Sequence, residues 1–351
     1  MTASACSKKA DTDKNTNVNK NKNSTDSEEQ ENTASVDDSL LQQLVVTVGK
    51  EKVLYSEAMI YFKYIQAQYE SNFGNKIWTY DFGEQNFGDM AKQEIINMIA
   101  QTKIIGTQAE KYNIVLTDDE EVLIQENADT FLAGLTADDI EQYGLTEEAA
   151  QLFYRDNMLY EKVFDAATMN VNTEVSDKEA KQITVQHLLV LSTEKDKDGK
   201  SIPMSKEKKA EAYAKVKDLL KQAKKTDDFL AFAQANTDDS EVEYTFGAGE
   251  MDQEFEKVAF ELKPGELSNI VETTYGFHII YCVSNFDEDA TLEKKEEIIE
   301  VRQDEAFQKL YEEWSKDYKI DINDKVWDAI KFTELSKEEA FEKPTEAPTQ
   351  E

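Results

Sequence analysis

The spacing of apolar residues changes twice along the chain, and this change is the strongest constraint on the fold. From about residue 40 to residue 170, apolar side chains recur every three to four positions, which is typical of helices with one buried face. The segments ITVQHLLVL and YGFHIIYCV instead read as strands, and they enclose about a hundred residues that mix helix and strand patterns. Helical spacing returns after residue 290. We therefore predict an α+β domain inserted between helical segments.

The inserted region, residues 182–285, is predicted to run in the order β-α-α-β-α-β-β. A polar stretch, STEKDKDGKSIPMS, follows the first strand and reads as a loop. Helices are expected over KEKKAEAYAKVKDLLKQA, DDFLAFAQAN and QEFEKVAFEL, and Pro264 and Gly265 forbid continuation of the last one. The first of these helices is expected to bury a face made of Ala210, Tyr213, Val216, Leu220 and Ala223.

Four further parts flank this domain. Residues 40–175 are predicted to form a helical region whose many aromatic side chains favour core packing over an exposed cleft for unfolded peptide. Residues 290–332 are predicted to return as a helical segment that packs on this region. Residues 1–38 have almost no apolar content and are expected to form a disordered tether, and residues 333–351 an acidic disordered tail. In the returning helix, the residues expected to be buried are Ile298, Val301, Phe307, Leu310 and Trp314.

The charge of the chain narrows the range of partners. Lys and Arg number 39 and Asp and Glu 73, so the net charge is −34. Such a surface repels nucleic acid, whose affinity for proteins depends on neutralising phosphates, and it disfavours direct adhesion to anionic lipid heads. The two cysteines provide neither a disulfide framework nor a metal-binding pattern, and no run of residues is apolar enough for a membrane-spanning helix.

The two histidines of the chain both fall within predicted strands. A single histidine in a strand is usually a satisfied core residue, but His187 and His278 can face each other if their strands are neighbours in one sheet. A zinc site would need a third ligand, for which Asp239 is the candidate, yet no Cys or Glu pattern supports it. Nucleophilic catalysis is also disfavoured, because Cys282 points to the interior side of an apolar strand. A paired histidine site therefore remains as the alternative to core packing.

Several segments of the inserted region resemble the parvulin-type peptidyl-prolyl isomerases. VQHLLV is similar to the first strand of that family and GFHIIY to its last. The stretch GEMDQEFEKVAFELKPGELSNIVETTYGFHII is similar to the family's long shared segment nearly throughout. The resemblance covers about residues 182–285, and it implies a prolyl isomerase that needs neither a metal nor another cofactor.

This resemblance also implies which residues form the site. His187 and His278 match the family's two strand histidines, and Asp239 falls where parvulins have a Cys or Asp near the substrate amide. The family's GGDLG stretch is shortened here to EVEY, and no basic loop for phosphoserine is present in the sequence. The residues implied to wall the prolyl pocket are Phe246, Met251 and Phe255.

The amino terminus bears a second resemblance. ASAC, ending at Cys6, resembles the end of a bacterial lipobox, in which small residues precede a lipidated cysteine, although the usual Leu and the apolar leader are not seen. Because a polar tether follows, a lipid anchor at Cys6 is favoured over a plain disordered tail. Without an anchor, the chain would be an acidic cytoplasmic protein.

The whole arrangement looks like the extracytoplasmic foldases of the PrsA and SurA type, whose flanking helices form a chaperone module. The resemblance implies a lipid-anchored foldase of the Gram-positive kind that isomerises prolyl bonds outside the cytoplasmic membrane. Its expected partners are unfolded or partly folded secreted polypeptides that contain proline, together with a second copy of itself in a homodimer. The alternative is a non-catalytic holdase that uses the parvulin fold as a peptide-binding module.

Overall fold

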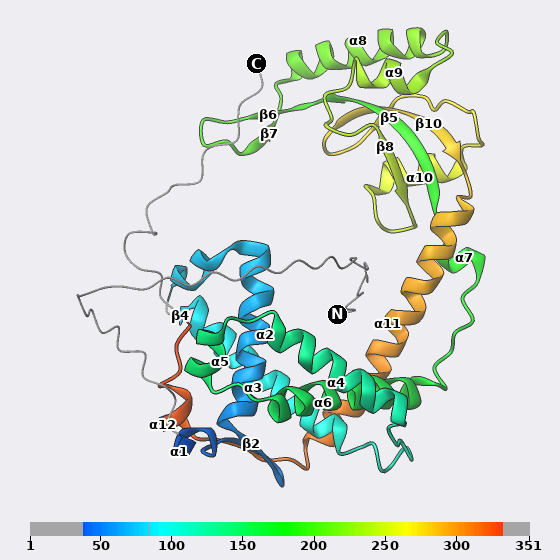
Figure 1. The fold of residues 1–351 in the computed structure, drawn as a ribbon. Helices are drawn as coiled ribbons and strands as arrows, with labels where there is room; N and C mark the ends of the chain where they lie inside the picture. Colours follow the sequence, from blue (N-terminus) through cyan, green and yellow to red (C-terminus); the bar gives the residue numbers. More distant parts are fainter. Residues whose placement is uncertain (1–37, 84, 333–351) are drawn as a thin grey trace, which may run out of the picture.

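The computed structural model describes residues 38–83 and 85–332, which form two lobes (Figure 1). Cys6, nearly all of the predicted tether and the predicted acidic tail lie outside the described residues. The long helix α11 (Glu288–Ser315) and the segment that contains α7 (Asp177–Ala180) connect the two lobes. Within the described ranges, no helix combines the length and the apolar content needed to cross a bilayer.

The helical lobe is built around helix α2, residues 55–73. Its side chains are buried without interruption from Glu57 to Lys63, because α3, α6 and a small sheet surround it. The sequence predicted one buried face, and the burial on every side reflects this central position. Capping boxes begin two of the surrounding helices, at Thr117 and Thr136, where each hydroxyl accepts a first-turn amide. The helices of this lobe are α2 (Tyr55–Phe73), α3 (Phe87–Gly106), α4 (Asp118–Ala133), α5 (Ala137–Tyr143) and α6 (Glu147–Thr168).

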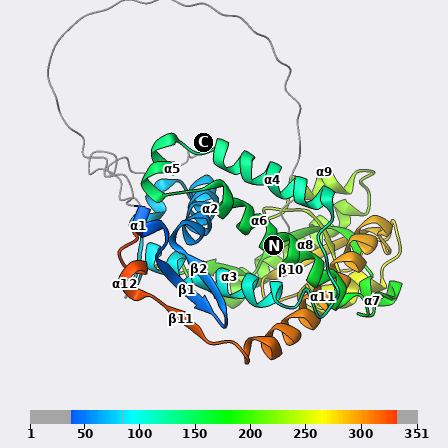
Figure 2. The same cartoon turned by 60° about the horizontal axis from the view of Figure 1, so that its bottom comes forward.

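Strands from both ends of the chain complete the helical lobe, which the sequence predicted to be purely helical. Strands β1 (Leu44–Val48) and β2 (Glu51–Leu54) form a hairpin, and β11 (Ile320–Ile322) pairs antiparallel with β1. Figure 2 shows β11 beside β1, with the short helices α1 (Asp38–Leu41) and α12 (Asp324–Trp327) close to this sheet. The remaining short elements of the lobe are η1 (Asn75–Thr79), β3 (Asp81–Phe82) and β4 (Gln85–Asn86).

Helix α11 reaches from one lobe into the core of the other. Phe307 and Trp314, in its second half, are buried in the helical lobe, as the sequence predicted. Val301 was also predicted to be buried, but 48% of its surface is exposed. Val301 therefore lies on a side of α11 that neither lobe covers, whereas Ile298 and Leu310, also predicted to be buried, are half-buried.

The sheet lobe, residues 183–284, contains an antiparallel four-stranded sheet in the order β8-β5-β10-β9. Helices α8 (Lys206–Ala223) and α9 (Phe229–Gln234) pack on one face, against the odd-numbered side chains Phe277 and Ile279 of β10. Helix α10 (Gln253–Glu261) packs on the other face. The strands are β5 (Ile183–Leu191), β8 (Glu243–Phe246), β9 (Val271–Glu272) and β10 (Gly276–Ser284).

Two details of the sheet lobe differ from the prediction. The stretch read as a polar loop contains a hairpin of β6 (Thr193–Lys195) and β7 (Ser201–Pro203). Helix α8 is also rotated from the expected orientation, because Tyr213 lies at the rim of the sheet, where its ring meets Phe277 edge-on at 5.3 Å and 46% of its surface is exposed. The buried face of α8 is made of Ala212, Val216, Leu219 and Ala223.

Candidate active site

The two histidines lie side by side on one face of the sheet. Strands β5 and β10 are antiparallel neighbours, with His187 opposite Ile280 and His278 opposite Leu189. This register puts both imidazoles on the α10 side of the sheet, one diagonal step apart. Their Nδ1 atoms are 3.3 Å apart, and the rings are nearly parallel, with 21° between their planes. The imidazoles therefore contact each other through one nitrogen each.

The outer nitrogens of the pair face two different polar groups. His278 Nε2 lies 2.8 Å from the hydroxyl of Thr273. His187 Nε2 lies 3.3 Å from Asp239 Oδ2, which is within ion-pair range, but the atoms are not aligned as a hydrogen bond. Thr273 was not identified from the sequence. Its only signal there is its place in the tight turn between the last two strands, which brings residues 273 and 278 together.

Both imidazoles are neutral at physiological pH. His187 is 3% exposed and His278 6% exposed. Burial, followed by the neighbouring His187 ring, lowers the pKa of His278 to about 4. Burial also lowers the pKa of His187, against the opposing pull of the Asp239 carboxylate. Neutral imidazoles are good metal ligands, but nowhere in the described part of the chain are three His, Cys, Asp or Glu side chains grouped to hold an ion.

Aromatic side chains cover the pair. The ring of Phe255, on α10, stands edge-on to His187 at 5.6 Å and to His278 at 5.2 Å. Met251 is half-buried beside this cluster, whereas Phe246 is 1% exposed and lies 6.0 Å behind Phe255. Of the three predicted wall residues, Phe255 and Phe246 are thus buried, at 5% and 1% exposed, and only Met251 is half-buried.

The shortened stretch EVEY contributes a side chain that the sequence analysis did not single out. The ring of Tyr244 lies 5.1 Å from that of His187. Its hydroxyl lies near the Asp239 carboxylate, and burial together with that carboxylate raises the pKa of Tyr244. The shortened segment thus still supplies a wall to the site, on the side of His187.

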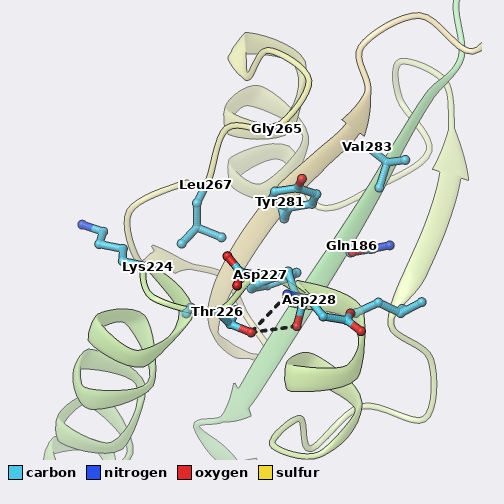
Figure 3. Close-up of a pocket in the computed structure, with 12 residues that line it drawn as sticks. Gln186, Lys224, Thr226, Asp227, Asp228, Gly265, Leu267, Tyr281 and Val283 are labelled. Atoms are coloured by element: carbon cyan, nitrogen blue, oxygen red, sulfur yellow. Dashed lines mark hydrogen bonds between the residues drawn. The ribbon is translucent and has the colours of Figure 1, made fainter.

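A hollow of ≈740 Å³ opens on the other face of the same sheet (Figure 3). It is lined by Tyr281, Leu267 and Val283, together with the loop at residues 224–228 that joins α8 and α9. Side chains alternate along β10, so Tyr281 points away from the face that carries His278. This hollow is therefore separate from the histidine site.

Comparisons with known proteins agree with this arrangement. Residues 187–284 match the family model of the rotamase, or PPIC-type PPIase, domain. The foldase protein PrsA of Caldanaerobacter subterraneus subsp. tengcongensis is 28% identical over 291 residues, which cover 78% of this chain and 87% of the relative. The foldase protein PrsA 2 of Listeria innocua is 30% identical over 270 residues, or 72% of this chain and 82% of the relative.

Solved structures of similar proteins include a peptidylprolyl isomerase (PrsA) from Bacillus cereus. That alignment covers 79% of this chain and 91% of the other, with 20% identity and a TM-score of 0.31. The sequence relatives and the domain match confirm the predicted parvulin resemblance, the α+β fold class and the isomerase activity. The chain belongs to the PrsA foldase family and carries a parvulin-type peptidyl-prolyl cis-trans isomerase domain.

Proposed function

We propose that His187, His278 and Asp239 form the catalytic centre of the isomerase domain, and that Met251 and Phe255 grip the prolyl ring. The observation that carries this proposal is the buried, neutral histidine pair, which lies between a partly exposed carboxylate and the hydroxyl of the half-buried Thr273. Such an arrangement is more elaborate than core packing requires, because an apolar pair would fill the same space without desolvating four ring nitrogens.

The hydrogen bonds of the centre favour one direction. The Tyr275 backbone N–H donates to the Thr273 oxygen at 3.2 Å, which leaves the Thr273 hydroxyl proton free to donate to His278 Nε2. His278 then carries its own proton on Nδ1 and donates it to His187 Nδ1. In this arrangement, His187 presents an N–H from Nε2 toward Asp239. The chain of donors thus ends at His187 Nε2, which faces the carboxylate at 3.3 Å without a hydrogen bond.

Asp239 is the member of the centre that reaches solvent, with 27% of its side chain exposed. Its Oδ1 accepts from the Ser240 backbone N–H at 2.8 Å, and its Oδ2 faces His187. The carboxylate is therefore fixed in place and remains accessible to a substrate. The two imidazoles act as positioning residues, since they are covered by aromatic rings.

Catalysis by this site needs no covalent step. Rotation about a peptide bond has a barrier of roughly 18–20 kcal/mol, because conjugation gives the C–N bond double-bond character. In the twisted state conjugation is lost, so the prolyl nitrogen becomes more basic and the carbonyl moves. A site accelerates the rotation only if it binds the twisted state more tightly than the planar one. The apolar grip of Met251 and Phe255 disfavours the charge-separated planar amide, and Asp239 supplies polar contact at the rim.

A protease-coupled assay with an unphosphorylated Ala-Pro peptide tests this function. The full chain is expected to accelerate cis-trans exchange, and Met251→Ala to lose much of the acceleration while the lobe stays folded. The holdase alternative predicts suppressed aggregation of an unfolded client with an unchanged exchange rate; the family relatives do not favour it. An exchange rate equal to that without protein would refute the proposed centre.

We propose that the helical lobe serves as the chaperone module for unfolded polypeptides, and that the chain divides functionally as the sequence predicted. Support comes from aromatic and apolar side chains at the end of α2 and the start of α3 that remain in solvent. Phe73 is 64% exposed, Tyr80 53% and Met90 44%. Exposed apolar side chains that gather in one region mark contact surfaces for other chains.

We further propose that the protein works outside the cytoplasmic membrane, held there by a lipid on Cys6, and that it acts as a homodimer. The motif ASAC and the polar tether support the anchor. Cell fractionation with mass spectrometry of the amino-terminal peptide tests the anchor, and a lipid-free Cys6 in the membrane fraction would contradict it. Light scattering of the purified chain tests the dimer, which a monomer mass at all concentrations would contradict.

A further inference from the structure

Phe332, at the end of the described part of the chain, is inserted between two other aromatic rings. Its ring lies 3.9 Å from that of Trp78, with 4° between their planes, and 4.1 Å from that of Phe62, at 19°. Only 6% of Phe332 is exposed, although it belongs to no helix or strand. Aromatic pairs in proteins usually prefer edge-on or offset contacts with centroids 4.5–7 Å apart. A ring stacked on both faces is therefore a special arrangement.

The walls of this aromatic slot are fixed by the helical lobe. The indole N–H of Trp78 donates to Glu70 Oε1 at 2.7 Å, and Phe87 packs against its ring at 5.5 Å. Phe62, on α2, is fully buried and contacts Tyr143 at 5.6 Å. These contacts hold the two walls one ring apart by means that do not involve Phe332.

The segment that delivers Phe332 is attached differently from the walls. We call residues 323–332 the carboxy-terminal strap. It is anchored where Asn323 donates to the backbone oxygens of Leu44 and Val45. Farther along, Lys92 Nζ donates to the carbonyls of Trp327 at 2.6 Å and Ile330 at 3.1 Å.

A hollow of ≈460 Å³ lies alongside the strap. Its lining includes Val326, Ala329 and Ile330 on the strap side and Tyr55 on the side of the lobe. Val326, Trp327 and Ile330 of the strap are 5–8% exposed and belong to the core of the helical lobe, so the hollow leaves only part of the strap unpacked, and only there do fewer dispersion contacts oppose its release than a filled core would provide. The anchor at residue 323 gives the strap a fixed point from which it can swing.

A row of aromatic side chains leads from the exposed Phe73 to the slot. Tyr69 contacts Trp78 at 6.0 Å and Phe87 at 4.9 Å, and it stacks on Phe73 at 6.3 Å. Phe73 is 64% exposed. A continuous row of rings thus connects the surface of α2 with the Trp78 wall of the slot.

We propose that the slot between Phe62 and Trp78 binds an aromatic side chain of an unfolded polypeptide, and that Phe332 is its built-in competitor. The occupant seen here defines the ligand chemistry: a flat six-membered ring at the end of an extended segment. The inference rests on the chaperone role proposed above. Because the strap fills the slot in part of the molecules, the apparent affinity for a client ring equals the affinity of the open slot multiplied by the fraction of molecules whose slot is open.

The test uses the full chain and two proline-free peptides that are identical except for a central Phe or Ala. If the strap fills the slot about 90% of the time, Phe332→Ala is expected to bind the Phe peptide about tenfold more tightly than the wild type. The Ala peptide is expected to show no such gain. Adding Trp78→Ala to Phe332→Ala removes one wall and is expected to abolish the gain. Fluorescence anisotropy of the two labelled peptides measures the affinities of the three proteins.

Matched variants separate this proposal from simpler explanations. Ile330→Ala loosens the strap but keeps Phe332 as a competitor, so it is expected to raise the affinity for the Phe peptide by less than Phe332→Ala does, and an equal gain for the Ala peptide would overturn the role of the ring. Equal gains for both peptides, or equal affinities of wild type and Phe332→Ala, would also overturn it. If Phe332→Ala fails to fold by circular dichroism, Phe332→Val, whose side chain is too small to fill the slot, replaces it in the same comparison. If the wild type also fails to suppress aggregation of an unfolded client, the chaperone role itself is wrong.

Discussion

Lowering the pH from 7 to 4.5 is expected to destabilise the sheet lobe through His278. The pKa of this residue falls from 6.5 to about 4 on folding, chiefly because of burial. Between these two values the unfolded chain binds a proton that the folded lobe does not, so stability falls as the pH falls. The stability is fully present above pH 6.5 and is lost as the pH approaches 4. For the step from pH 7 to 4.5 the loss amounts to about 2 kcal/mol.

A variant without this titration isolates the effect from the many carboxylates of the chain. His278→Asn keeps a polar side chain that does not ionise, and His187 is present in both proteins. Tryptophan fluorescence would miss the transition, because Trp78, Trp314 and Trp327 all lie in the helical lobe. Hydrogen exchange of the amides of β5 and β10, corrected for the intrinsic pH dependence, reports the opening free energy of the sheet lobe itself.

The wild type is expected to lose about 2 kcal/mol more than His278→Asn between pH 7 and 4.5. The comparison uses the change with pH, so a lower stability of the variant at pH 7 does not affect it. Parallel pH dependences in the two proteins would refute the reasoning. They would mean that His278 titrates near its ordinary value in the folded state, and that the pair is not held neutral by burial.

Three further substitutions test the site and its support. Asp239→Asn is expected to lower kcat/KM for a prolyl peptide about tenfold or more, equivalent to at least ~1.4 kcal/mol, while amide hydrogen exchange in the sheet stays unchanged. An unaltered kcat/KM would show that the carboxylate takes no part in catalysis. Thr273→Val leaves Nε2 of the partner histidine without a hydrogen bond and is expected to lower the free energy of unfolding of the sheet lobe by about 1–3 kcal/mol. Thr273→Ser retains the hydroxyl and is expected to keep this stability, so equal losses in the two variants would contradict the hydrogen bond. Lys103 contacts the buried carboxylates of Glu57 and Asp156 at 2.6 Å each. Lys103→Met is expected to destabilise the helical lobe by about 3–5 kcal/mol, measured by tryptophan fluorescence during urea unfolding, and no loss would show that the carboxylates are uncharged.

The sequence predicted best those features of the site that depend on the residue pattern within a single strand. Alternation along a strand places His187 and His278 on defined faces, whereas the pairing of β5 with β10, which brings the two faces together, is seen only in the structure. Thr273 could not be found in this way, because its contact with His278 depends on the register of a two-residue strand. Phe246 was assigned to the pocket wall by resemblance, and only the packing of Phe255 against it shows that it lies in the core.

Contacts between distant parts of the chain were the least predictable. β11 pairs with β1 across more than two hundred residues, and a three-residue strand has too little pattern to reveal a partner. The placement of Phe332 between Phe62 and Trp78 likewise depends on the path of the strap after that pairing. Lys92 has a charged side chain that sequence alone assigns to the surface, yet it is 7% exposed because it binds two backbone carbonyls of the strap.

The most direct test of the isomerase centre is NMR exchange spectroscopy of an Ala-Pro peptide with the full chain labelled at its methionine methyl groups. The cis-trans exchange is expected to be accelerated, with a peptide-dependent shift of the Met251 methyl signal and loss of the acceleration in the doubly substituted Met251→Ala, Asp239→Asn chain. Exchange at the uncatalysed rate, or acceleration that persists in the double variant, would show that prolyl isomerisation does not occur beside the paired histidines.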